Sequence, residues 1–90
     1  MKFHEQVLLD IANGERCFSA DVGADDGSSL NQDDKESWDL TFQEAIRYIE
    51  DNFSFYLRKY GRDSAILASV CDEMGEPIVV YNGKKWELWK

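Results

Sequence analysis

The stretch TFQEAIRYIEDNFSFYLRKYG, residues 41–61, decides the fold because it carries the strongest periodic pattern in the chain. Its large apolar residues recur every three to four positions, which is the period of an amphipathic helix. They are Phe42, Ala45, Ile46, Ile49, Phe53, Tyr56, Leu57 and Tyr60. Thr41 and Glu44 have the spacing of a capping box, and Gly61 follows as a C-terminal cap. We therefore predict a helix over about residues 41–60 that buries one face.

Three strand-like segments follow this helix, at residues 64–72, 77–81 and 84–90. The dipeptide Asn82-Gly83 is the one preferred in a two-residue type I′ turn. The last two segments are therefore predicted to form a tight hairpin. Together the three segments are predicted to form an antiparallel meander.

The predicted turn sets the pairing in this hairpin, because it places Tyr81 opposite Lys84 and Val79 opposite Trp86. Alternate side chains of a strand point to opposite faces of the sheet. One face, predicted to pack on the long helix, holds Pro77, Val79, Tyr81, Trp86 and Leu88. The other face holds Ile78, Val80, Lys85, Glu87 and Trp89, and is unusually apolar for a solvated surface.

Two further elements precede the long helix. Residues 2–12 have an apolar stripe with helical spacing, and residues 16–22 alternate as a strand does, with Phe18, Ala20 and Val22 predicted to face the core. The resulting order predicts an α+β two-layer sandwich, in which the long helix and the short N-terminal helix pack on an antiparallel sheet. With 90 residues the chain is predicted to be a single domain, residues 1–90.

Residues 21–39, DVGADDGSSLNQDDKESWD, hold seven carboxylates and one lysine, and thus six of the eight net negative charges. Gly, Ser, Asp and Asn dominate residues 23–37, which are predicted to form a flexible acidic loop. Such a charge distribution repels nucleic acid and anionic lipid and attracts basic surfaces. Direct binding to nucleic acid or to a membrane is therefore not expected. Residues 1–14 do not have the pattern of a signal peptide, so a cytoplasmic location is expected.

The acidic segment does not have the pattern of a calcium loop. An EF-hand loop needs a glycine at its sixth position. A loop starting at Asp21 has Asp26 there, and a loop starting at Asp25 has Leu30. No metal site is therefore predicted in this segment.

The sequence also contains no pattern typical of a catalytic or cofactor site. His4 is the only histidine, and Cys17 and Cys71 lie far apart without the spacing of a zinc site. No serine has a nucleophile motif and no glycine cluster can cradle phosphates. The paired carboxylates are in a polar loop, where burial does not raise the pKa as acid catalysis requires. We therefore expect neither an enzyme nor a cofactor.

The function we expect is that of a small acidic binding protein that blocks a basic partner, either a nuclease or another nucleic-acid-binding protein. Its carboxylates would occupy the site that otherwise binds phosphates. Toxin-immunity proteins and phage-encoded inhibitors of restriction or CRISPR nucleases share this small size and acidic charge. The candidate partner-binding residues are Asp21, Asp25, Asp26, Asp33, Asp34, Glu36, Asp39 and Glu44. Trp38 either anchors this interface or packs back on the long helix.

The alternative is a homodimeric structural or regulatory module in which the acidic loop is only a solubilising surface. In that case the apolar outer face of the sheet, with Ile78, Val80 and Trp89, is the dimer face.

Overall fold

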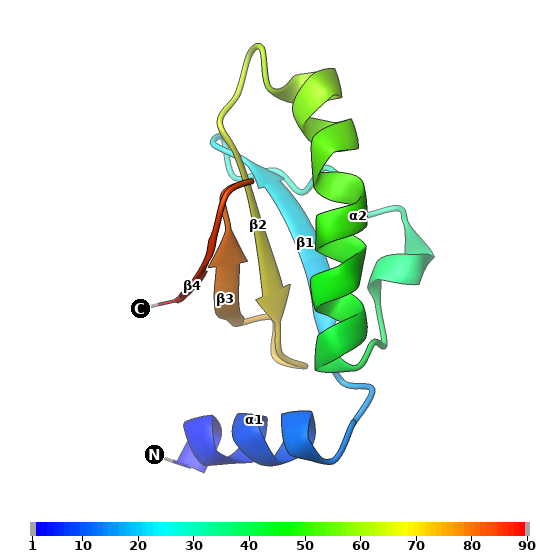
Figure 1. Ribbon diagram of the computed structural model, residues 1–90, viewed down its shortest axis with the longest axis vertical. Coiled ribbons are helices and arrows are strands. Elements are labelled where there is room, and N and C mark those ends of the chain that lie inside the picture. Colours follow the sequence, from blue (N-terminus) through cyan, green and yellow to red (C-terminus); the bar gives the residue numbers. More distant parts are fainter. Residues whose placement is uncertain (1, 90) are drawn as a thin grey trace.

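The fold is a four-stranded antiparallel sheet with one long helix packed on one face, as the computed structural model shows (Figure 1). The structure describes residues 2–89, with side chains from Glu5 to Trp89. Its elements are α1 (Lys2–Ala12), β1 (Ser19–Ala24), the 3₁₀ helix η1 (Lys35–Ser37), α2 (Phe42–Tyr60), β2 (Ile66–Cys71), β3 (Pro77–Tyr81) and β4 (Trp86–Leu88). The strands lie in chain order, β1-β2-β3-β4. The predicted α+β two-layer fold is thus confirmed, whereas α1 lies at one end of the sheet and not on its face as predicted.

Helix α2 begins and ends where its sequence predicts. Thr41 is the N-cap: its hydroxyl accepts from the Glu44 N–H at 3.1 Å, and the Glu44 carboxylate accepts from the Thr41 N–H at 2.9 Å. These two bonds form the predicted capping box and satisfy two N–H groups at the helix start. At the other end, the Gly61 N–H donates to the Leu57 carbonyl at 2.8 Å.

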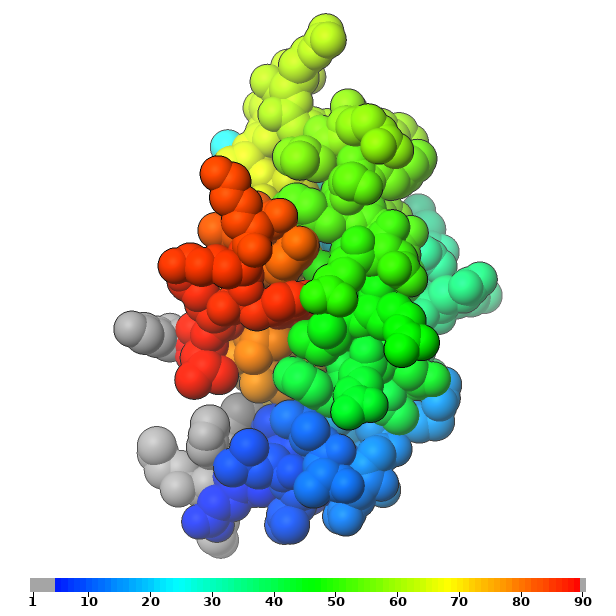
Figure 2. All heavy atoms as spheres, in the orientation of Figure 1, coloured from blue at the N-terminus to red at the C-terminus, as the bar shows by residue number. Residues whose placement is uncertain are grey.

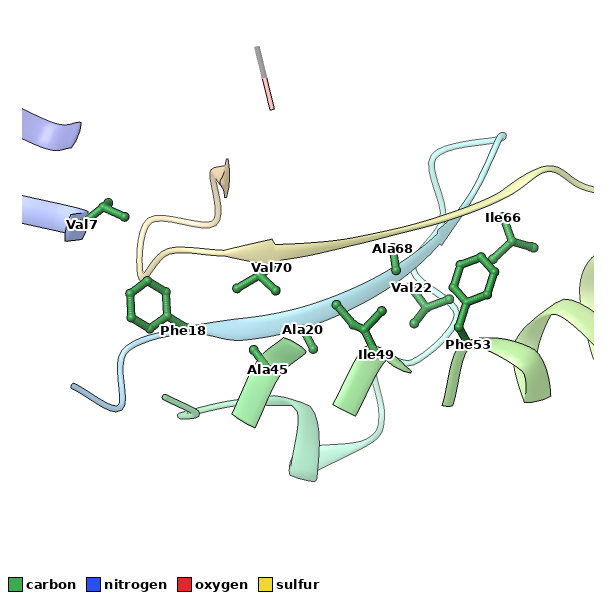
Figure 3. Packing of buried hydrophobic residues seen from close by; sticks show 10 residues of the cluster. All are labelled: Val7, Phe18, Ala20, Val22, Ala45, Ile49, Phe53, Ile66, Ala68 and Val70. Carbon is green, nitrogen blue, oxygen red and sulfur yellow. The ribbon is translucent and has the colours of Figure 1, made fainter. Parts of the chain in front are cut away.

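The core lies between α2 and the first two strands, where three sets of alternating or periodic side chains meet (Figure 3). They are Ala45, Ile49 and Phe53 of α2, Phe18, Ala20 and Val22 in and before β1, and Ile66, Ala68 and Val70 of β2. Val7 of α1 reaches the same cluster from the end of the sandwich. In Figure 2 the atoms of α2, in green, lie beside those of the β3–β4 hairpin, in orange and red. Burial of each large apolar side chain contributes about 1.5–3 kcal/mol.

The β3–β4 hairpin differs from its prediction in register. Tyr81 pairs with Trp86 and Val79 with Leu88, so residues 82–85 form a four-residue loop. The predicted two-residue type I′ turn is therefore wrong. Because the register differs by two residues, every side chain of β4 keeps its predicted face. Tyr81 still faces α2, where its ring makes an edge contact with Phe53 at 5.2 Å.

The longer loop has a local cause in Asn82. Its side-chain Oδ1 accepts from the backbone N–H groups of Lys84 at 2.9 Å and Lys85 at 3.0 Å, which closes the loop as a turn residue would. Gly83 has φ +95°, and a Cβ at this position would lie 2.8 Å from the ring of Phe53. The Asn-Gly pair therefore does direct a turn, but of four residues.

A β-bulge in β3 corrects two face assignments, because Pro77 was predicted on the helix side and Ile78 on the outer face. Val70 pairs with Val79, whereas the next residue, Cys71, pairs with Pro77, so Ile78 is an extra residue on this strand. Pro77 consequently lies opposite Cys71 on the face turned away from α2, and its predicted position on the helix side is wrong. Ile78 packs against the core cluster.

Candidate functional site

The acidic segment runs back along the outer edge of β1. Leu40 and Phe18 exchange two backbone hydrogen bonds of 2.8 and 2.9 Å, and the Leu30 N–H donates to the Val22 carbonyl at 2.7 Å. An uncovered strand edge is a template for pairing with another chain. The segment therefore covers the edge of the sheet at β1.

Asn31 completes this edge with its side chain instead of its backbone. It is 3% exposed; its Oδ1 accepts from the Val22 N–H at 2.9 Å and its Nδ2 donates to the Ala20 carbonyl at 2.9 Å. The Tyr48 hydroxyl lies 3.4 Å from Nδ2 and donates to the Asp34 carboxylate at 2.7 Å. Burial and the hydrogen bond to Asp34 raise the pKa of Tyr48, so its hydroxyl stays a donor. Sequence reasoning missed Asn31 because nothing in its neighbourhood distinguishes it from a loop residue.

Two of the eight candidate partner-binding residues, Asp34 and Glu44, cap helices. Asp34 caps η1 by accepting from the Glu36 N–H at 3.0 Å, in addition to its bond from Tyr48. Glu44 belongs to the capping box of α2 and forms an ion pair with Arg16 at 3.0 Å. Both carboxylates therefore stabilise the fold as well as carrying charge.

Three others lie on exposed turns. The Asp26 carboxylate accepts from the Ser28 hydroxyl at 2.6 Å and its N–H at 2.9 Å, and these two bonds lower the pKa of Asp26. Asp33 lies just before η1 and Glu36 within it, and both are exposed. All three carboxylates therefore face solvent.

Of the remaining candidates Asp21, Asp25 and Asp39, the first two border the face of the sheet that α2 leaves uncovered, here called the open face. Asp21 alternates along β1 with the core residues and Asp25 follows the strand. Both line a hollow of about 500 Å³, the β-face hollow. Its apolar floor includes Leu67, Pro77, Val80 and Trp89. Leu67 is 45% exposed and Trp89 51%, so this floor is open to a partner.

A second hollow of about 400 Å³, the corner hollow, lies where β1 begins. Its lining includes Arg16, Cys17, Ser19, Trp38, Asp39, Asp72 and Glu73. Trp38 is 51% exposed, so the interpretation that it packs on the long helix is wrong. Its role as an interface anchor stays a prediction.

The two hollows share a negative charge. Among residues 5–89, their linings contain the carboxylates of Asp21, Asp25, Asp39, Asp72 and Glu73, and one base. That base, Arg16, is in the ion pair with Glu44. Sequence reasoning missed Asp72 and Glu73, because they follow β2 and only the tertiary fold brings them beside Trp38 and Asp39.

The two cysteines are free and both thiols are held in the protonated form. Burial, reinforced by the charges of Asp10, Glu73 and Glu15, raises the pKa of Cys17 to about 11. Burial also raises the pKa of Cys71. Neither thiol therefore has the lowered pKa of a reactive cysteine.

Two features are absent from the described part of the chain. Within it, no group of three or more His, Cys, Asp or Glu side chains is arranged to hold a metal ion. Neither of the described helices combines the length and the apolar character that crossing a membrane requires. The side chain of His4 lies outside the described residues.

The candidate site is thus an open sheet face with an apolar floor and carboxylates at both ends. Comparison with proteins of known function adds nothing to this geometry: no protein-family model, curated protein or solved structure matches the chain.

Proposed function

We propose that this chain is a non-catalytic cytoplasmic protein that binds and blocks a basic surface of another protein, namely a nuclease or other nucleic-acid-binding protein. The observation that carries the proposal is the excess of carboxylates in the two hollows, five against one paired arginine among the described residues. A negative surface of this kind repels nucleic acid and increases the rate of encounter with a basic protein.

The apolar floor of the β-face hollow favours a protein partner. Leu67, Val80 and Trp89 lie side by side with Asp21 and Asp25, so a partner can bury apolar area while its basic groups meet carboxylates. Protein interfaces typically combine an apolar centre with a polar rim, and tryptophan is common among the residues that dominate binding. Small size and concentrated acidity support a role as a phage counter-defence inhibitor or a toxin-immunity protein.

A competition assay tests this proposal. The purified protein is titrated into complexes of a fluorescent DNA duplex with individual nucleases of the restriction, CRISPR and toxin classes. We expect it to displace DNA from at least one nuclease, with an association rate that falls steeply as salt increases. If no nuclease in these three classes releases DNA, the proposal is wrong.

Matched charge variants locate the binding surface. Asp25→Asn with Asp39→Asn removes two exposed carboxylates at the hollows and should slow association about three- to tenfold. Asp51→Asn with Asp63→Asn removes the same charge from α2 and the turn that follows it, and should change the rate much less. Equal effects of the two pairs would show that only net charge matters and that the open face is not the interface.

The alternative, a homodimer through the open face, is favoured by one observation: Leu67 and Trp89 are both about half exposed beside Val80. Such a dimer would bring Asp21 and Asp25 of two copies together, which costs free energy at low salt. Light scattering distinguishes the two cases. A dimer gives twice the monomer mass and becomes monomeric in Trp89→Ala, whereas a mass that stays monomeric at high concentration excludes it.

A further inference from the structure

The corner hollow is formed by three segments that are far apart in the sequence. The start of β1 contributes Cys17 and Ser19, the turn after β2 contributes Asp72 and Glu73, and residues 38–39 form the remaining side. The hollow therefore exists only in the folded chain. Its volume of about 400 Å³ is sufficient for a long side chain.

Asp72 is the unusual residue in this lining, because its carboxylate is buried and only half satisfied. The residue is 6% exposed. Its Oδ1 accepts from the Met74 N–H at 2.8 Å and the Glu76 N–H at 3.0 Å, which holds the turn between β2 and β3. Its Oδ2 accepts no hydrogen bond from the described residues. A buried polar atom without a partner is costly and rare in native proteins.

Trp38 provides the opposite kind of surface. Half of it is exposed, although a tryptophan has more apolar area to bury than any other residue. It lies in the same lining as Asp39, Asp72 and Glu73. An exposed aromatic face beside carboxylates attracts a cation, which the ring and the charges both stabilise.

Arg16, the one base that the described residues contribute to this lining, does not neutralise these carboxylates. The Nη1 atom of Arg16 lies 3.0 Å and 3.2 Å from the two carboxylate oxygens of Glu44 on α2. The raised pKa of Cys17, due to burial and then to carboxylates that include Glu73, is consistent with a negative potential here.

From this geometry we propose that the corner hollow is a socket for an arginine side chain of the partner protein, which stacks on Trp38 and donates hydrogen bonds to Asp72 and Glu73. An arginine fits better than a lysine, because a guanidinium is planar, stacks on aromatic rings and offers several donors in a fixed plane. The inference rests on the proposed function and names the group with which the basic partner engages this chain.

The test uses N-acetyl-arginine amide as the probe and N-acetyl-citrulline amide as its neutral control of the same shape. The indole N–H signal of Trp38 in the full chain is followed by NMR as each compound is added. We expect a saturable shift with the arginine probe and none with the citrulline probe. Asp72→Asn keeps the Oδ1 acceptor that the turn needs, and should weaken binding about fivefold or more. Asp51→Asn, an exposed residue of α2, should leave the binding unchanged.

Three results would overturn the socket: no saturable shift at Trp38, the same shift with citrulline, or unchanged affinity in Asp72→Asn. If Asp72→Asn does not fold, Trp38→Leu replaces it, with the amide signal of Ser19 as the reporter. Unchanged affinity in that variant also overturns the proposal.

The outcome is separable from that of the proposed function. If the protein displaces DNA from a nuclease equally well with and without Trp38, the socket is wrong while the blocking function stands. If the arginine probe binds as expected but no nuclease releases its DNA, the socket stands and the blocking function is wrong.

Discussion

Replacing Asn31 by alanine should destabilise the fold strongly, although this residue lies in a polar loop. The side chain of Asn31 is the hydrogen-bond partner of the Val22 N–H and of the Ala20 carbonyl, and it is 3% exposed. Alanine leaves both backbone groups without this partner at a buried site. At about 1–2 kcal/mol for each group, the free energy of unfolding should fall by about 2–4 kcal/mol. For a domain of 90 residues this lowers the Tm by roughly 10–30 °C.

Urea denaturation followed by circular dichroism measures this change, and amide hydrogen exchange locates it. The Val22 amide should exchange much faster in Asn31→Ala, even under conditions in which the protein remains folded. Gln32→Ala is the matched control, since it removes a neighbouring side-chain amide that is exposed. If Asn31→Ala unfolds within about 0.5 kcal/mol of the unchanged chain, the acidic segment does not hold the edge of β1 and the reasoning fails.

Three further predictions concern the helix cap, the pH dependence and the thiol. Thr41→Ala removes half of the capping box and should cost about 1 kcal/mol in urea denaturation. The pKa of Glu44 is lowered from 4.5 by its bond from the Thr41 N–H and by Arg16, so its stabilising effect is present above that value and is lost as the pH falls through the lowered pKa. Glu44→Gln should therefore lose less stability on acidification, as measured by thermal unfolding. Because the pKa of Cys17 is about 11, its alkylation by iodoacetamide should be slow at neutral pH and accelerate about tenfold per pH unit up to that value.

The parts of the fold that the sequence predicted are those determined by local pattern. In α2 the helical period, the capping box and the terminal glycine all agree, so its bounds match the prediction closely. The alternation of Phe18, Ala20 and Val22 likewise identified the buried side of β1. Periodicity is sufficient to predict these two elements because each pattern indicates which face is buried.

The hairpin loop and the bulge were not predictable, because the sequence pattern neither fixes the loop length nor marks an extra residue in a strand. An Asn-Gly pair is compatible with more than one loop length. Nothing in the sequence PIVVY indicates that Ile78 is the extra residue of a bulge, because every position there is apolar or proline. The corner hollow was missed because Asp72 and Trp38 meet only after folding.

Two adjacent carboxylates show why charge counted along the chain does not identify a binding surface. Asp33 and Asp34 are equivalent in the sequence, and both contribute to the concentrated negative charge. In the structure Asp33 is exposed, whereas Asp34 accepts from the Tyr48 hydroxyl and the Glu36 N–H. Replacing Asp34 by asparagine would remove a negative charge and would also weaken the hydrogen bonds that hold the acidic segment on β1. A loss of partner binding in Asp34→Asn would therefore have two causes. Only carboxylates outside the internal network, with Asp25 and Asp39 nearest the hollows, separate recognition of a partner from stability of the fold.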